Sequence, residues 1–273
     1  MIGPMPAALR LIHPAPALAV VLLSGALGAI MATQAGLPIG SGWALTMLAV
    51  AGSQVFTGAT NDIADRSRDA ATRPEKPIAS GELSLNAATW IASAGLALQL
   101  VASWRTGELA LALGAAATAS ALAYNLALSR TPFSAVPYLG SFGLLPAWIA
   151  AGVGVPLERV LPAIPLVAPF AVAAHLANTL RDFEADAAGG SRSLVQLLGR
   201  RTSLRLAAGL ALAVGLGVGG ALLLGGRATP AGIGLGLVGL LAVAQGAFSE
   251  RRLWYGILVA AVCWTAGWAL STA

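Results

Sequence analysis

The segment Asn61-Asp62-Ile63-Ala64-Asp65-Arg66-Ser67-Arg68-Asp69 lies where a long apolar run gives way to charge. It spaces an asparagine and two aspartates four residues apart, and Asn178, Asp182 and Asp186 repeat that spacing after a later apolar run. Residues four apart lie on one face of a helix, one turn after another. Each segment is therefore expected to present three oxygen ligands in a row at the end of a membrane-spanning helix.

The apolar runs around these segments decide the fold class. The chain is 57% hydrophobic and 10% charged, whereas soluble domains are about a quarter charged. The runs lack the alternation of a β-barrel strand, so they predict helices. We expect an all-α polytopic membrane protein, with a single transmembrane domain over residues 1–273 and about nine helices around a central cavity. The expected spans are about Ala15–Ala32, Gly42–Thr60, Leu85–Ser103, Glu108–Asn125, Phe133–Gly152, Val160–Leu180, Leu206–Leu224, Ala231–Phe248 and Leu253–Leu270.

Charged residues give an orientation to this topology. With these spans, 13 of the 16 Lys and Arg residues fall on the side of the N-terminus. The positive-inside rule then places the N-terminus and both aspartate-rich segments in the cytoplasm and the C-terminus outside, across the inner membrane. Most acids share that side although acids contribute little to topology, which indicates a cytoplasmic active site. The net charge of +5 suits anionic lipid headgroups, so no nucleic acid is expected. The single cysteine, Cys263, excludes an intrachain disulfide and a cysteine metal cluster.

The residue types in the two segments indicate the chemistry. Carboxylate and amide oxygens are ligands for Mg²⁺ or Ca²⁺ rather than for zinc or copper. Mg²⁺ commonly binds one or two protein carboxylates together with substrate phosphates and water. Two facing segments can thus hold a diphosphate between metal ions, with Arg73, Lys76 and Arg192 neutralising its remaining charge. The alternative, a wet loop with alternating charges, does not explain the repeated spacing.

Four motifs follow one another along the chain: Asn61-Asp62-x-x-Asp65-x-x-x-Asp69, Arg73-Pro74-x-Lys76-Pro77-Ile78-x-x-Gly81, Tyr124, and Asn178-x-x-Arg181-Asp182-x-Glu184-x-Asp186 before Ser193-Leu194 and Leu198-Gly199. Together they resemble the UbiA superfamily of intramembrane prenyltransferases. The resemblance implies a nine-helix fold, an isoprenyl diphosphate bound through Mg²⁺, and prenyl transfer to an aromatic or other lipophilic acceptor. The spacing after Asp69 looks more like the branch with archaeal lipid and chlorophyll enzymes than the hydroxybenzoate branch.

The resemblance also implies roles for individual residues. Metal ligation falls to Asn61, Asp65, Asp69, Asn178, Asp182 and Asp186. The catalytic set is Asp65, Asp69, Asp182, Asp186 and Tyr124. Substrate binding falls to Asp62, Arg73, Lys76, Arg130 and Arg192. By its position one turn before Asn178, His175 is expected either to bind substrate in the cavity or to be a hydrogen-bonded structural histidine. The chain departs from the family pattern at Arg130, where a lysine often follows the tyrosine closely, and at His13-Pro14, where many relatives have Arg-Pro.

Two other functions remain open. Within the same family, a terpene cyclase or a transferase of another activated diphosphate would use the same site, and a cyclase would capture the cation internally. From another class, a membrane transporter or lipid-binding protein can have nine spans. Transporters carry broken helices and charges near the middle of the bilayer. Here the charges gather at one face, which favours the prenyltransferase.

Overall fold

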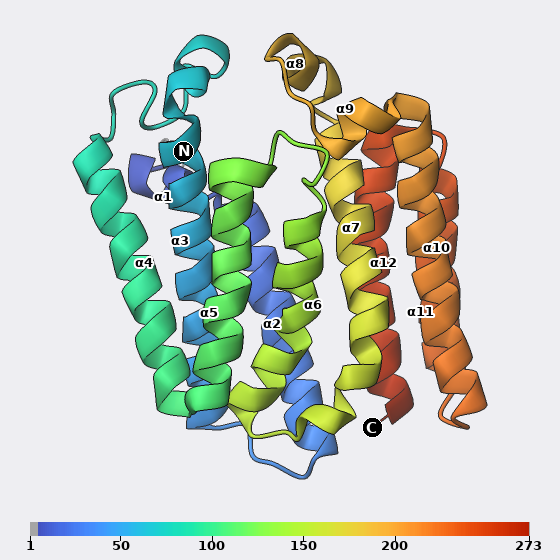
Figure 1. Cartoon of the computed structure of the whole chain (residues 1–273). Helices are drawn as coiled ribbons and strands as arrows, with labels where there is room; N and C mark the ends of the chain where they lie inside the picture. The colour runs from blue at the N-terminus through green and yellow to red at the C-terminus, as the bar shows by residue number, and fades with distance from the viewer. Residues whose placement is uncertain (1–4, 273) are drawn as a thin grey trace.

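The computed structural model describes residues 5–272, which form an up-and-down bundle of long helices (Figure 1). Within this range there is no strand, which confirms the all-α expectation. Seven helices are long and apolar enough to cross a membrane. The charged α3 and the 17-residue α11 complete the expected nine in the described chain. The long helices are α2 (Pro14–Gln34), α3 (Ser41–Thr72), α4 (Leu85–Thr106), α5 (Glu108–Ala123), α6 (Val136–Val153), α7 (Ile164–Leu180), α10 (Arg200–Leu224), α11 (Pro230–Gly246) and α12 (Glu250–Thr272).

Short elements gather at the end of the bundle that carries the charged motifs. The extended end of α3 lies there with α8 (Phe183–Ala188) and α9 (Leu194–Leu198), while α12 ends at the opposite side (Figure 1). The short α1 (Ala7–Leu11) packs beside α3 and α4. A π-helical turn, η1 (Tyr124–Leu128), continues α5 toward the same end. At the opposite end, two 3₁₀ turns, η2 (Leu157–Arg159) and η3 (Leu161–Ala163), connect α6 and α7 (Figure 1).

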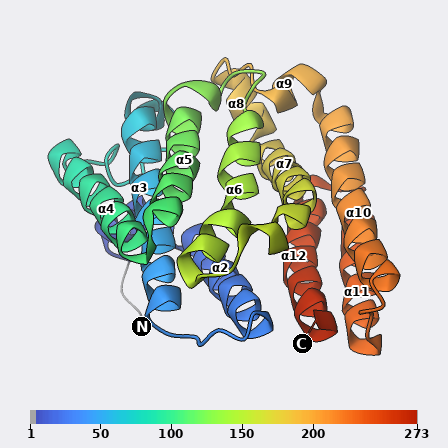
Figure 2. The same ribbon diagram turned by 60° about the horizontal axis from the view of Figure 1, so that its bottom comes forward.

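The helices fall into two packed groups joined in the middle. Figure 2 turns the bundle so that the end away from the charged motifs comes forward. In this view α3, α4 and α5 lie on one side and α10, α11 and α12 on the other, with α2, α6 and α7 between them. On the first side, small residues bring α3 and α4 into backbone contact. A Cβ at Gly52 would lie 2.6 Å from the carbonyl oxygen of Gly95. Such close packing by small residues is typical of membrane helices, and it holds the charged end of α3 in place.

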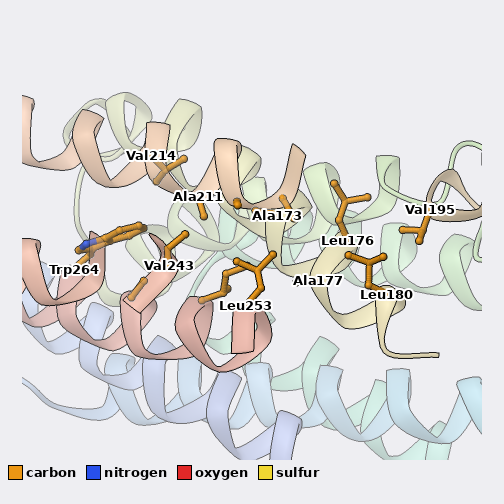
Figure 3. Packing of buried hydrophobic residues seen from close by; sticks show 14 residues of the cluster. Ala173, Leu176, Ala177, Leu180, Val195, Ala211, Val214, Val243, Leu253 and Trp264 are labelled. Carbon is orange, nitrogen blue, oxygen red and sulfur yellow. The ribbon is translucent and has the colours of Figure 1, made fainter. Parts of the chain in front are cut away.

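The second group positions the other motif. A buried apolar cluster joins α7, α9, α10, α11 and α12, and its members include Leu176, Leu180 and Val195 (Figure 3). Leu180 and Val195 are fully buried. Because Leu180 is the last residue of α7 and Val195 lies in α9, the cluster fixes both sides of the segment 181–193.

Candidate active site

The first aspartate-rich motif lies on one uninterrupted helix. As expected, α3 continues past the apolar run, to Thr72. Asp62 and Asp69 are only 1% and 3% exposed, and both accept a hydrogen bond from Lys76 Nζ at 2.8 Å. Seven residues are close to two helical turns, so these two aspartates share a face. Asp65, four residues before Asp69, shares this face and forms an ion pair with Arg68.

The loop after α3 connects this motif with the second one. Residues 73–83 fold into turns through backbone bonds from Ser80 to Lys76 (2.8 Å) and from Leu83 to Pro77 (2.9 Å). Lys76 thereby returns to α3. Arg73, three residues earlier, forms an ion pair with the Asp182 carboxylate at 3.2 Å. One loop therefore contacts both motifs through two predicted substrate-binding residues.

The second motif differs from its predicted geometry. Its helix ends at Leu180, and Asp182 lies in a turn before α8. The prediction of one continuous face through Asn178, Asp182 and Asp186 is therefore wrong. The carbonyl oxygen of Phe183 accepts a hydrogen bond from the Gln196 side chain at 2.7 Å, which directs α8 over α9 instead of along α7. Asp182 and Asp186 still lie one turn apart, because the Asp186 amide donates to the Asp182 carbonyl oxygen at 2.8 Å.

Arg130 and Arg192 lie beside the second motif. The Arg130 side chain binds the carbonyl oxygen of Gly189, just after α8. The Arg130 carbonyl oxygen accepts a hydrogen bond from the Arg192 amide at 3.0 Å. Arg130 departs from the family pattern, but its side chain still brings a positive charge to the second motif.

Tyr124 belongs to a group of rings between α5, α6 and α7. Its ring meets Tyr138 edge-on at 5.3 Å between centroids and His175 at 5.7 Å. Tyr138 lies 4.3 Å from His175 and stacks on Phe142 at 5.7 Å. His175 is buried, with Nε2 3.1 Å from Ser134 Oγ and Nδ1 3.4 Å from Thr179 Oγ1. Both of its nitrogens are engaged, so this side chain holds the ring group together.

Carboxylates of the two motifs interact electrostatically with the same basic residues. Burial raises the pKa of the Asp65 carboxyl, and the charge of Arg68 only partly opposes this. Burial also raises the pKa of Asp186, and neighbouring Asp182 adds to the effect. Arg130 interacts with both Asp65 and Asp186. The charge of this arginine therefore acts on carboxylates from both motifs.

Lys76 and Arg73 are held in their charged forms. Burial by itself lowers the pKa of Lys76, but the hydrogen bonds that Lys76 donates to Asp62 and Asp69 outweigh it and raise the pKa. The pKa of Arg73 is also raised: burial opposes this, but the charge of Asp182 prevails. The loop thus brings two permanent positive charges between the motifs.

The donor set fits Mg²⁺. Within residues 5–272, no three His, Cys, Asp or Glu side chains already form a metal-binding group. The carboxylates of Asp65, Asp182 and Asp186 are nevertheless hard oxygen donors, and burial disfavours the ionised form of two of them unless a cation is near. Mg²⁺ needs only one or two carboxylates when phosphates and water complete its shell.

Two residues that contact the first motif in the structure, Asn125 and His13, were not predicted from the sequence to do so. Asn125 donates to the Thr57 carbonyl oxygen at 2.8 Å and accepts from Asn61 at 3.4 Å. Its position directly after Tyr124, at the end of an apolar run, was an available signal. His13 Nε2 lies 3.0 Å from Asp62 Oδ1, a contact between distant segments that no sequence spacing indicates.

Comparison with known proteins gives the family. The model of the UbiA prenyltransferase family matches residues 21–253. Digeranylgeranylglyceryl phosphate synthase of Methanoculleus marisnigri is 32% identical over 58% of this chain, although the match spans only 56% of that relative. The synthase of the same name from Thermococcus kodakarensis is 30% identical over 80% of this chain and 76% of its own length.

A solved structure supports the fold. A UbiA homologue from Archaeoglobus fulgidus, solved with GPP and Mg²⁺, superimposes with a TM-score of 0.70 at 18% identity, over 98% of this chain and all of the homologue. The matched region includes both aspartate-rich motifs and the loop that connects them. On this evidence the chain belongs to the UbiA prenyltransferase family.

Proposed function

We propose that the chain is a Mg²⁺-dependent intramembrane prenyltransferase, formed as one domain by residues 1–273. The observation that carries this proposal is the loop 73–83, which binds the first motif through Lys76 and the second through Arg73. A site with carboxylates on two sides and cations between them suits a diphosphate held with metal ions. The homologue solved with GPP and Mg²⁺ supports an isoprenyl diphosphate as the substrate.

Each group in the site has a proposed task. The metal ligands are Asn61, Asp65, Asp69, Asn178, Asp182 and Asp186, and bound Mg²⁺ would stabilise charge on the leaving diphosphate. Lys76 has three N–H donors, of which Asp62 and Asp69 take two, so the third is available for a diphosphate oxygen. Arg73, Arg130 and Arg192 supply further positive charge. Asp62, buried behind Lys76, contributes to substrate binding through that lysine.

The reaction needs both the polar end and the ring group. The bond between the first prenyl carbon and the diphosphate oxygen breaks, and its electron pair leaves with diphosphate. The allylic cation that results is protected from water by apolar walls, and the faces of Tyr124, Tyr138 and Phe142 can stabilise it. The acceptor then forms the new bond and loses a proton. His175 acts by holding the Tyr138 ring.

The acceptor is proposed as a lipophilic molecule. The expectation was an aromatic or other lipophilic acceptor, and the name of the relatives, digeranylgeranylglyceryl phosphate synthase, favours a glyceryl phosphate lipid. Lipid chains would reach the site laterally, since the apolar helices place it in a membrane. No role for nucleic acid is proposed.

The orientation follows from charge. We place the protein in the cytoplasmic membrane with the N-terminus and the site facing the cytoplasm and the C-terminus outside, because 13 of the 16 basic residues belong to that side. The arrangement in Figure 1 is compatible with this, because both motifs lie at one end of the bundle.

The test is turnover by the purified protein in lipid nanodiscs. Radiolabelled isoprenyl diphosphates of several lengths would be supplied with and without Mg²⁺, together with a glyceryl phosphate lipid or an aromatic acceptor. A labelled adduct that requires Mg²⁺ and disappears in Asp182→Asn is the expected result. Diphosphate release that yields only a hydrocarbon would indicate the cyclase instead. No release from any substrate would contradict the proposed function.

A further inference from the structure

The N-terminal arm, residues 6–13, lies against the loop between α3 and α4. Its helix α1 contacts both of these helices, and Leu11 is fully buried in an apolar cluster with them. The Arg10 side chain binds the Glu82 carboxylate and donates to the Glu75 carbonyl oxygen at 3.3 Å. The arm therefore touches the loop at two separate points.

The arm also approaches the backbone of α3. A Cβ at Gly58 would lie 2.9 Å from the carbonyl carbon and oxygen of Ile12, so only glycine allows this contact. The next residue, His13, has φ 50° and ψ 66°, and among the described residues it is the one non-glycine with positive φ. A side chain makes this conformation unfavourable, and it persists only where surrounding contacts hold it. The chain is thus held where His13 lies over the turn of α3 that carries Asp62.

His13 and Lys76 bind the same oxygen of Asp62. His13 Nε2 lies 3.0 Å from Oδ1, and Lys76 Nζ lies 2.8 Å from that atom. A carboxylate paired with lysine only accepts hydrogen bonds, so Nε2 carries the proton. The other oxygen, Oδ2, is buried and meets no donor within residues 5–272. Two donors on one oxygen fix how the carboxylate is turned, and hence where Lys76 lies.

We propose that His13 is a positioning residue, which acts through Asp62 to hold Lys76 beside Asp69 and toward the diphosphate. This inference rests on the proposed function, because it takes Lys76 as a diphosphate ligand. Without His13, the Asp62 carboxylate can rotate and offer Lys76 its second oxygen, which moves the ammonium group. Arg10 supports the same loop at its surface but does not touch Asp62.

The test is a double-mutant cycle on the affinity for geranyl diphosphate with Mg²⁺, measured by calorimetry in nanodiscs. His13→Leu removes the donor, whereas His13→Gln keeps an N–H at a similar reach. His13→Leu should weaken binding roughly fivefold to tenfold, within the net effect of a typical hydrogen bond, and His13→Gln by less than about twofold. In the Lys76→Gln background, His13→Leu should cause no further loss, because the two residues act as one unit.

A second measurement does not depend on the substrate. Amide exchange of Ser80 and Leu83, whose N–H groups hold the loop turns, should be faster in His13→Leu than in wild type and unchanged in His13→Gln. Equal losses of affinity from His13→Leu in both backgrounds, or unchanged loop exchange, would overturn the inference. If the wild type does not bind geranyl diphosphate, the proposed function fails, and loop exchange alone decides whether His13 positions the loop.

Discussion

Lys76 and Arg73 carry the same charge on the same loop, but their burial predicts different contributions to stability. The Lys76 side chain is 14% exposed, and Lys76→Met would leave the buried carboxylates of Asp62 and Asp69 without their cation. Breaking a buried ion pair by removing one partner costs about 3–5 kcal/mol. His13 still donates to Asp62, so we expect a loss of stability near the lower end, about 3 kcal/mol.

Arg73 serves as the matched comparison. Its side chain is 43% exposed and that of its partner Asp182 is 51% exposed, so solvent screens the pair. Such pairs contribute at most about 1 kcal/mol. Arg73→Met should therefore change stability little, and the change should shrink further in high salt. Both variants should nevertheless weaken diphosphate binding, since both remove a cation from the site.

The assay is the thermal unfolding midpoint of each variant in detergent, without substrate, at low and high salt. For a protein of this size, about 3 kcal/mol corresponds to a decrease of roughly 6–12 °C. The pKa of Lys76 is raised in the fold, so its stabilisation is complete below the ordinary value of 10.5 and is lost as the pH rises through the raised pKa. The difference between wild type and Lys76→Met should accordingly persist at neutral pH and shrink in strong alkali. Equal midpoints for the two variants would refute the argument from burial.

Three further predictions concern the site, the packing and the topology. Asp65→Asn should lower turnover by about two orders of magnitude or more. The unfolding midpoint of this variant should not fall, because burial disfavours the charged carboxylate of Asp65. A lower midpoint would indicate a structural role for Asp65 instead. Gly58→Ala should destabilise the protein by about 1–3 kcal/mol by pushing the N-terminal arm away. Gly209→Ala, on an open helix face, is its control in the same unfolding assay. A reporter fused after Ala273 should read as external, and a cytoplasmic signal would contradict the proposed orientation.

The fold and the first motif could be predicted because local patterns determine them. Apolar length predicts the long helices, and the spacing from Asn61 to Asp69 predicts a helical face that α3 indeed provides. The second motif has the same spacing but a broken helix. The break depends on Gln196, whose side chain binds the Phe183 backbone from α9, and on packing between α8 and α9. A spacing rule contains no information about such contacts.

The support around the site was predictable only in part. Lys76 was expected near a diphosphate, and the structure places it between two carboxylates of α3. The role of His13 depends on the close approach of the arm to Gly58 and on a positive φ. Both are consequences of tertiary packing. Sequence reasoning therefore found the groups of the proposed site but missed the arm that holds one of them.

The charge balance of the site argues that metal must accompany the substrate. Five carboxylates and four basic side chains gather there: Asp62, Asp65, Asp69, Asp182 and Asp186 with Arg68, Arg73, Lys76 and Arg130. The protein's own charges thus nearly cancel, and no surplus remains for a multiply charged diphosphate. Divalent cations would supply it while satisfying the buried carboxylates. We therefore expect chelation of Mg²⁺ to weaken geranyl diphosphate binding itself by tenfold or more, at least ~1.4 kcal/mol, and not only to stop turnover. Calorimetry with EDTA in place of Mg²⁺ checks this, and undiminished affinity would mean that the basic side chains alone hold the diphosphate.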